Sequence, residues 1–181
     1  MRTIILAALA ASAVAAPAFA QTADSVEPTS AFTPVVAVSA GLGRFADGSE
    51  EFEGGSAIVR TSLRLHRNFG VEADGSFGLE TSDIAGYDFK MKHTVAGYVV
   101  GYWPLADNVD LIGRVGYGES EFEISNGVAS VSDAYSGVTA GVGAQYFFDE
   151  KNGLRMDVTR HHYEELGGGM DSVMFTYVRN F

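Results

Sequence analysis

The stretch "RHHYEE" at residues 160–165 holds the side chains of this sequence that are best suited to chemistry. His161, His162, Glu164 and Glu165 are metal ligands or proton-transfer groups by type, and His161 could act as a general base. Adjacent residues of a β-strand point to opposite faces, however, so the two histidines cannot both enter one site. We interpret the stretch as a strand end that enters a solvated loop, and we expect no catalytic residue, no metal site and no cofactor.

Acidic side chains gather in the long polar stretches of the chain, at Asp47, Glu50, Glu51, Glu53, Asp83, Asp88, Glu119, Glu121, Glu123, Asp133, Glu164, Glu165 and Asp171. None of these stretches has the residue spacing of an EF-hand calcium loop. Solvated surface charge is therefore the simplest interpretation, and binding of divalent cations remains an alternative.

The first twenty residues have the pattern of a secretory signal peptide. Arg2 is followed by an apolar run from Ile4 to Val14 and then by Ala18-Phe19-Ala20. The run is shorter than the ~20 residues of a membrane-spanning helix, which disfavours the alternative of a membrane anchor. We expect cleavage after Ala20, a short polar lead-in over residues 21–33, and one domain over residues 34–181.

Composition narrows the class of protein further. The chain has no cysteine and a formal net charge of −11, so it lacks both disulfides and the basic surface of a nucleic-acid-binding protein. No second apolar run approaches the length of a spanning helix. If the mature protein crosses a membrane, it does not do so with helices.

Apolar residues recur with a period of two, which is the pattern of β-strands. In "LRMDV", Leu154, Met156 and Val158 alternate with Arg155 and Asp157. We predict eight strands, near residues 34–45, 56–67, 71–80, 90–104, 109–120, 134–148, 153–163 and 172–181.

The connections between these strands alternate in length. Three are short, at residues 67–70, 104–108 and 149–152, and four are long, at residues 46–55, 81–89, 120–133 and 164–170. Short turns at one end and long loops at the other are typical of an outer-membrane barrel. Aromatic residues near the two ends predict two interfacial girdles, one of Phe69, Tyr102, Trp103, Phe147, Phe148 and Phe181, the other of Tyr87, Phe89, Tyr117, Phe122, Tyr135 and Tyr163.

The two faces of the strands differ in charge. The polar face offers four basic and four acidic residues, which we predict form a charge network inside the barrel: Arg60, Arg64, Glu72, Asp74, Asp110, Arg114, Arg155 and Asp157. The other face should meet lipid and includes Val59, Leu63, Leu65, Tyr98, Val100, Leu111, Val115, Val138, Val142 and Tyr146. Arg160 breaks this pattern, either because it lies near the headgroups or because a bulge shifts the register. A soluble barrel with the polar face outside is the alternative.

The hairpin around "RNFG" allows a prediction of register. Pairing Arg67 with Val71 leaves the three-residue loop Asn68-Phe69-Gly70, with Gly70 in the left-handed position that such loops favour. This register would set His66 opposite Glu72 and Arg64 opposite Asp74.

Three segments together resemble a known family: "GYVVGYWPLADNVDLIGRVGYG" (97–118), "GVTAGVGAQYFF" (137–148) and "LRMDVTRHHYEELGGGMDSVMFTYVRNF" (154–181). They look like the strands and hairpins of the OmpA-like, or opacity-type, outer-membrane β-barrel proteins of the porin family. The resemblance implies an all-β fold, an eight-stranded antiparallel transmembrane up-and-down barrel. It also implies that the C-terminal strand, with Phe175, Tyr177 and Phe181, is the signal read by the barrel-assembly machinery. Arg179 departs from the family, which more often has an apolar or aromatic residue there.

We therefore expect a monomeric protein of the Gram-negative outer membrane, in contact with outer-membrane lipids and lipopolysaccharide. Its role would be structural, in surface interaction or in membrane integrity, with a filled interior, no open pore and no enzymatic activity. The alternatives are a lipid A-modifying barrel enzyme and a periplasmic ligand-binding barrel. The lipid A deacylase pattern pairs a strand histidine with a serine two residues later, where this chain has Tyr163.

Overall fold

The computed structural model describes residues 32–47, 53–84, 87–125, 129–163 and 168–181. Their strands are β1 (Val35–Asp47), β2 (Glu53–His66), β3 (Phe69–Gly78), β4 (Thr81–Ile84), β5 (Tyr87–Ala106), β6 (Val109–Ser125), β7 (Ser130–Phe147), β8 (Asn152–Tyr163) and β9 (Gly168–Asn180). None of the described residues belongs to a helix that is long and apolar enough to cross a membrane. The predicted signal peptide and most of the lead-in lie outside the described residues.

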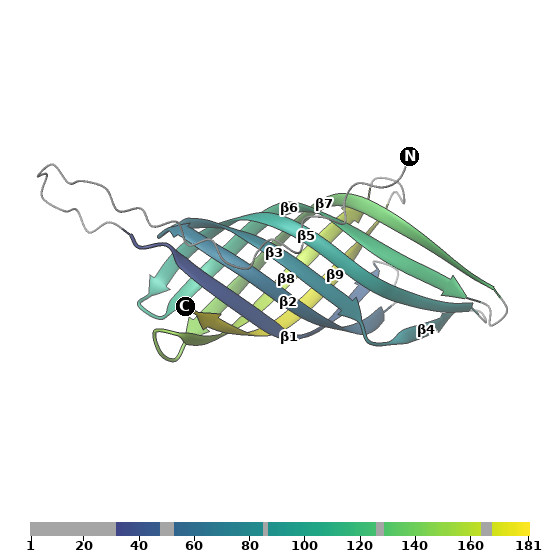
Figure 1. Cartoon of the computed structure of the whole chain (residues 1–181), viewed down its shortest axis with the longest axis horizontal. Coiled ribbons are helices and arrows are strands. Elements are labelled where there is room, and N and C mark those ends of the chain that lie inside the picture. Colours follow the sequence, from purple (N-terminus) through teal and green to yellow (C-terminus); the bar gives the residue numbers. More distant parts are fainter. Residues whose placement is uncertain (1–31, 48–52, 85–86, 126–128, 164–167) are drawn as a thin grey trace, which may run out of the picture. The chain divides into compact units, whose positions relative to one another are not determined.

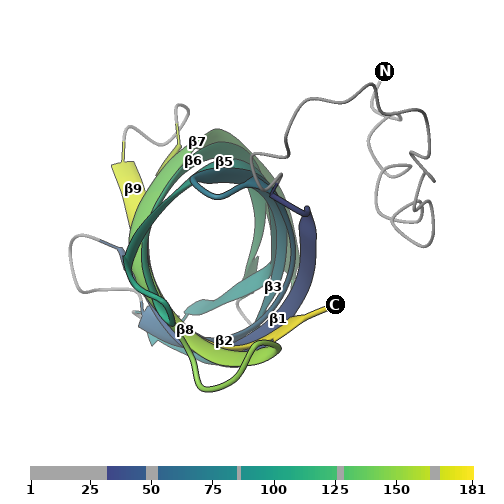
Figure 2. The same ribbon diagram turned by 90° about the vertical axis from the view of Figure 1, so that its left-hand side faces the viewer.

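The strands form one antiparallel sheet that closes on itself (Figures 1 and 2). Apart from β3 and β4, each strand pairs with its neighbour in sequence, and β1 pairs with β9. Both β3 and the short β4 pair with β5, so these two strands share one position of the barrel. The result is the predicted closed antiparallel barrel with eight strand positions.

The strands extend further than the alternation predicted. The predicted loop at 120–133 is largely strand, because β6 continues to Ser125 and β7 begins at Ser130. The predicted loop at 81–89 contains β4 and the start of β5. These strand ends are rich in polar residues, so they lack the regular apolar face on which the prediction depended.

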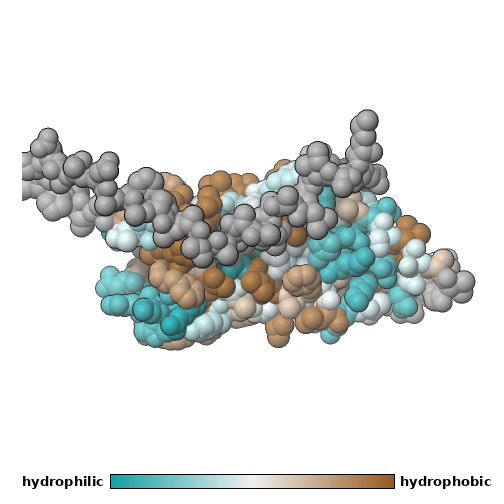
Figure 3. Space-filling model, viewed as in Figure 1, coloured by the Kyte–Doolittle hydropathy of each residue, from teal (hydrophilic) through white to brown (hydrophobic). Residues whose placement is uncertain are grey.

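The outer face of the barrel is apolar over most of the predicted lipid-facing positions. Figure 3 shows hydrophobic residues across the middle of one side of the barrel and hydrophilic residues gathered mainly toward its ends. Exposed side chains of this face include Val59, Leu65, Leu111, Val115, Val138, Val142 and Tyr146. Near the short turns, the Trp103 ring lies over Gly101 and Gly113, where an added Cβ would come within 3.0 Å of the indole.

Two predicted lipid-facing residues point the other way. Tyr98 and Val100 of β5 are 5% and 0% exposed and belong to a buried cluster with Ala96, Tyr102 and Ile112. The stretch around them is apolar on both faces, so alternation could not tell its inner face from its outer one.

The predicted aromatic girdles are smaller than expected. At the short-turn end, Phe69, Trp103 and Phe181 are exposed, whereas Tyr102 is buried. At the loop end, Tyr87 and Tyr117 are exposed, whereas three other aromatic residues of the predicted girdle are not. That group consists of Phe122, Tyr135 and Tyr163, which pack inside the barrel.

Candidate functional site

The charge network begins on the hairpin of β2 and β3. Arg60 on β2 faces Asp74 on β3, and Ser62 faces Glu72. Arg60 Nε donates to Asp74 Oδ1 at 2.7 Å and Arg60 Nη2 donates to Asp74 Oδ2 at 3.0 Å. This two-pronged pair is the geometry that the planar guanidinium favours.

The predicted register of this hairpin is wrong. Arg64 lies opposite Gly70, not Asp74, and His66 lies opposite Phe69, not Glu72. A register irregularity between Arg64 and His66 precedes a two-residue turn, so the loop is shorter than the predicted three residues. The polar face is kept, because the observed register differs from the predicted one by an even number of residues.

Residues from β6 and β8 complete the network across the lumen. Arg114 Nη1 of β6 donates to Asp74 Oδ2 at 2.8 Å. Asp157 of β8 accepts from Arg60 Nη1 at 2.9 Å and from Arg155 Nε at 2.8 Å. The buried ion pairs thus join strands that are distant in the barrel order.

The network is balanced in charge and closed to solvent. Its centre contains three guanidinium groups and three carboxylates, those of Arg60, Arg114, Arg155, Glu72, Asp74 and Asp157. Arg60 is 0% exposed and Asp157 is 1% exposed. Removing such charges from water costs several kcal/mol per ion, a cost that only complete pairing offsets. The Arg155–Glu72 pair adds two further bonds, and Tyr102 donates to Glu72 at 3.3 Å.

The other two predicted network residues lie nearer the short turns. Arg64 Nη1 donates to Asp110 Oδ2 at 2.8 Å, and Gln145 Nε2 donates to the same oxygen at 2.8 Å. The Arg64 guanidinium also bonds to the Arg67 carbonyl and stacks on the Tyr102 ring, 4.3 Å from its centroid. The structure thus divides the eight predicted charges into a central group of six and an outlying pair.

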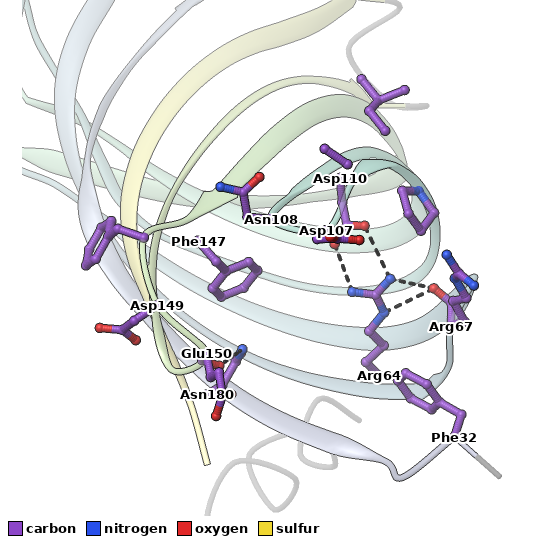
Figure 4. A pocket seen from close by; sticks show the side chains of 14 residues that line it. Phe32, Arg64, Arg67, Asp107, Asn108, Asp110, Phe147, Asp149, Glu150 and Asn180 are labelled. Atoms are coloured by element: carbon purple, nitrogen blue, oxygen red, sulfur yellow. Dashed lines mark hydrogen bonds and ion pairs between the residues drawn. The ribbon is translucent and has the colours of Figure 1, made fainter. Parts of the chain in front are cut away.

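A hollow of about 690 Å³ opens beyond this pair, at the short-turn end of the lumen (Figure 4). Its lining includes Phe32, Arg64, Asp107, Phe147 and Glu150. The β5–β6 and β7–β8 turns supply most of its rim. No sequence pattern predicted this hollow, because its lining comes from turns that meet only in the closed barrel.

An apolar cluster fills the lumen on the other side of the network. It consists of Phe45, Met91, Tyr163 and Met170, with Phe122 and Tyr135 packed against it. Tyr163 Oη lies 2.8 Å from Ser120 Oγ, which lies 2.7 Å from Thr94 Oγ1. Sequence reasoning placed three of these aromatics in a girdle, because position near a loop does not tell which face a side chain occupies.

The "RHHYEE" stretch does not assemble a reaction centre in its described part. His161 is buried in the lumen and His162 is exposed on the opposite face, as strand alternation predicted. His161 Nε2 lies 3.5 Å from Ser172 Oγ. No group of three or more His, Cys, Asp or Glu in the described ranges could hold a metal ion. Glu164 and Glu165 lie outside these ranges.

Arg160 lies on the outer face without a bulge. The register of β8 with both neighbours is continuous through this residue. Its Nη1 is 2.6 Å from Asp171 Oδ2, and both side chains are half exposed. The second explanation offered by the sequence, a bulge, is therefore wrong, and a position of Arg160 near the headgroups stays a prediction.

Of the predicted assembly signal, Phe175 and Tyr177 lie on the outer face of β9, and Phe181 directly follows this strand. Phe175, Tyr177 and Phe181 are 61%, 44% and 75% exposed. Tyr177 and Arg179 both donate to Asn152 Oδ1, the latter at 2.7 Å. The Phe181 amide donates to the Val36 carbonyl at 2.9 Å, which fixes the last residue to β1.

Comparison with known families identifies the barrel. The family described as "Outer membrane protein beta-barrel domain" matches residues 6–178. The chain belongs to this family. Its closed antiparallel barrel, with an apolar outer face and a polar lumen, is accordingly a barrel of the cell outer membrane. A comparison with curated proteins returns no match.

Solved structures of small outer-membrane barrels share the fold. Ail, the attachment invasion locus protein of Yersinia pestis, in complex with the heparin analogue sucrose octasulfate, has a TM-score of 0.64 at 13% identity, covering 83% of this chain and 100% of that one. Neisserial surface protein A has a TM-score of 0.64 at 10% identity, covering 82% and 97%. The N-terminal barrel of Pseudomonas aeruginosa OprF has a TM-score of 0.59 at 10% identity, covering 80% and 96%. At these identities the likeness concerns the fold alone.

Proposed function

We propose that this outer-membrane barrel is a closed scaffold with a structural, surface-interaction or membrane-integrity role and no open pore. The observation that carries the proposal is the ion-pair network across the lumen, with Arg60 bonded to both Asp74 and Asp157. A barrel of eight strands is just wide enough for side chains to fill. The apolar cluster around Met91 fills a second section of the lumen, nearer the long loops.

Conductance in planar bilayers tests the closed lumen. Pure folded protein should give no large, stable openings. A variant in which Arg60, Arg155 and Asp157 are all replaced by alanine provides a comparison with a partly emptied lumen. Reproducible openings of porin size from the unaltered protein would contradict the proposal.

The proposed role does not include catalysis. His161, the residue that could act as a base, faces the lumen and is 8% exposed, away from the lipid on which a lipid A-modifying enzyme would act. Mass spectrometry of lipid A from cells with and without the gene tests this statement. A difference in acylation between the two would favour the enzymatic alternative.

The export and assembly of the barrel form a further part of the proposal. We place signal-peptide cleavage after Ala20, a lead-in over 21–33 and the barrel over 34–181, and N-terminal sequencing of the mature protein tests this division. Phe175, Tyr177 and Phe181 would be read by the barrel-assembly machinery. Deletion of Phe181 should lower the amount of heat-modifiable folded protein in the outer membrane, and an undiminished amount would refute its role.

The proposed partners are outer-membrane lipids and lipopolysaccharide, and the barrel would act as a monomer. The exposed apolar belt and the half-exposed Arg160–Asp171 pair support lipid contact. Native mass spectrometry from mild detergent measures both oligomeric state and bound lipid.

A further inference from the structure

The short-turn end of the lumen contains two adjoining hollows. The outer one has a volume of about 690 Å³ and the inner one about 100 Å³. They share four lining residues, Phe32, Arg64, Phe147 and Asn180. Together they make a space that is wide at the rim and narrow toward the charge network, and its outer part is of the size that small-molecule sites have.

The rim of the outer hollow carries an excess of negative charge. Two arginines, Arg64 and Arg67, face four carboxylates, those of Asp107, Asp110, Asp149 and Glu150. Arg64 neutralises Asp110, and Asp149 is bonded within its own turn. The Glu150 carbonyl accepts from Asn180 Nδ2 at 3.2 Å. Within the described ranges, however, the carboxylates of Asp107 and Glu150 have no hydrogen-bond or ion-pair partner, and they belong to two different turns, β5–β6 and β7–β8. A cation that enters the mouth would find two carboxylates available.

The wall between the rim and the inner hollow is partly apolar. Phe32, Leu105 and Phe147 line it, and Figure 4 shows the Phe147 ring among the polar groups of the mouth. Aromatic rings attract ammonium groups and also cover alkyl chains. A ligand with a short aliphatic chain would therefore bury its apolar surface against this wall while its charged group stays at the rim.

The inner hollow contains a polar group that needs a partner. Ser39 lines it, is 1% exposed, and its Oγ has no hydrogen-bond partner within the described barrel. A buried hydroxyl without a partner costs free energy that an incoming donor or acceptor recovers. The positively charged residues Arg64 and Arg155 also line the inner hollow, so a second cation is disfavoured there. An uncharged polar group suits this position.

We propose that the short-turn mouth binds a primary ammonium ion on a short aliphatic chain whose other end is an uncharged polar group. The ammonium lies between Asp107 and Glu150, the chain lies along Phe32 and Phe147, and the polar end reaches Ser39 Oγ. Ser39 is four residues along β1 from Val35, or about 13 Å of strand, so the ligand binds in an extended form. This site lies on the side of the charge network away from the loops, and it leaves the lumen closed.

Titration of the folded full-length mature barrel in detergent with aminohexanol tests the proposal, with hexanediol as the matched probe that lacks the ammonium. NMR shifts of the amides around Asp107 and Ser39 report binding. Aminohexanol should bind saturably and about fivefold more tightly than hexanediol, and added salt should reduce this preference. Equal binding of the two probes, or no saturable binding of aminohexanol, would overturn the proposal.

Substitutions assign the two ends of the ligand. The double change Asp107→Asn with Glu150→Gln should remove the preference for aminohexanol over hexanediol. Ser39→Ala should weaken the binding of both probes about fivefold and leave the ratio of their affinities unchanged. Asp133→Asn, on β7 near the opposite end of the barrel, is the matched control and should change nothing. A preference that survives the double change would refute the rim site. The variant should still fold, because the Asp107 and Glu150 carboxylates have no hydrogen-bond or ion-pair partner among the described residues.

Discussion

The middle of the lumen and its loop end are filled by opposite chemistry. In the middle, Arg60 is held by directional hydrogen bonds to Asp74 and Asp157. Each of these three buried charges depends on the opposite charges beside it. At the loop end, Met91 and Phe45 pack in an apolar cluster that is held by contact area. Both groups are almost fully buried, so exposure does not distinguish them.

The difference lies in what each region tolerates. A buried ion-pair network fixes which strands face each other, but loss of one member leaves an uncompensated charge. An apolar cluster depends on volume, so an exchange that conserves volume costs little. Substitutions that remove a charge from the network, and substitutions that change side-chain volume in the apolar cluster, should therefore show which interaction stabilises each region.

The largest effect is expected for Arg60→Met. The change leaves Asp74 and Asp157 short of a partner, at a cost of about 3–5 kcal/mol in the free energy of unfolding. Urea unfolding of the folded barrel in detergent measures it. The double change Arg60→Met with Asp74→Asn should be less destabilising than the sum of its parts, because the second change removes one of the uncompensated charges. Additive effects would mean that the two residues do not interact.

The apolar cluster should respond to volume. Met91→Ala removes a side chain that is 1% exposed and should cost about 2–3 kcal/mol. Met91→Leu keeps the volume and should cost less than about 1.5 kcal/mol. The same unfolding measurement compares the pair. Equal costs for alanine and leucine would show that this region is not held by packing.

A smaller effect is expected at Gly141, where the network needs space. A Cβ at this position would lie 2.7 Å from Thr159 Oγ1, 2.8 Å from the Val158 carbonyl oxygen and 3.2 Å from Arg114 Nε. Gly141→Ala should therefore displace Arg114 from its 2.7 Å bond to Thr159, at a cost of about 1–2 kcal/mol. Gly97→Ala is the control, because nothing lies within 4 Å of the added atom. Similar losses in the two variants would argue against crowding as the cause.

The same contrast explains what the sequence could predict. Where one face of a strand is charged and the other apolar, as around Arg60 and Arg155, the residues that alternation assigned to the lumen are buried. Around Tyr98 and Val100 both faces are apolar, and the prediction failed. The apolar cluster of the loop end was missed for the same reason, since an aromatic residue is compatible with either face.

Specific partners were beyond the reach of the sequence. Alternation limits a hairpin register to shifts of even size, but the turn decides among them, and the turn after Arg64 is tighter than predicted. The Arg64–Asp110 and Arg60–Asp157 pairs join strands that are separated by long stretches of chain. Such pairs depend on the stagger of the closed barrel, which no local pattern encodes.

The smallest effect concerns the β7–β8 turn, where charge acts at the surface. Asp149 accepts bonds from the Lys151 and Asn152 amides at 2.8 Å and from the Asn152 side chain. The Asn152 side chain, followed by these amides, lowers the pKa of Asp149 below its ordinary value. A lowered pKa means that the ionised carboxylate is favoured by folding, so its stabilisation is complete above the ordinary carboxyl pKa of about 3.9 and fades as the pH falls below that value.

Amide exchange of Lys151 and Asn152 should accelerate over this acidic range, while the amide of Val100 in β5 stays protected. Asp149→Asn should abolish the acid-dependent change, and its persistence in that variant would assign it to another group. Exposed and solvated, this turn should open without unfolding the barrel, whereas loss of Arg60 affects the whole fold.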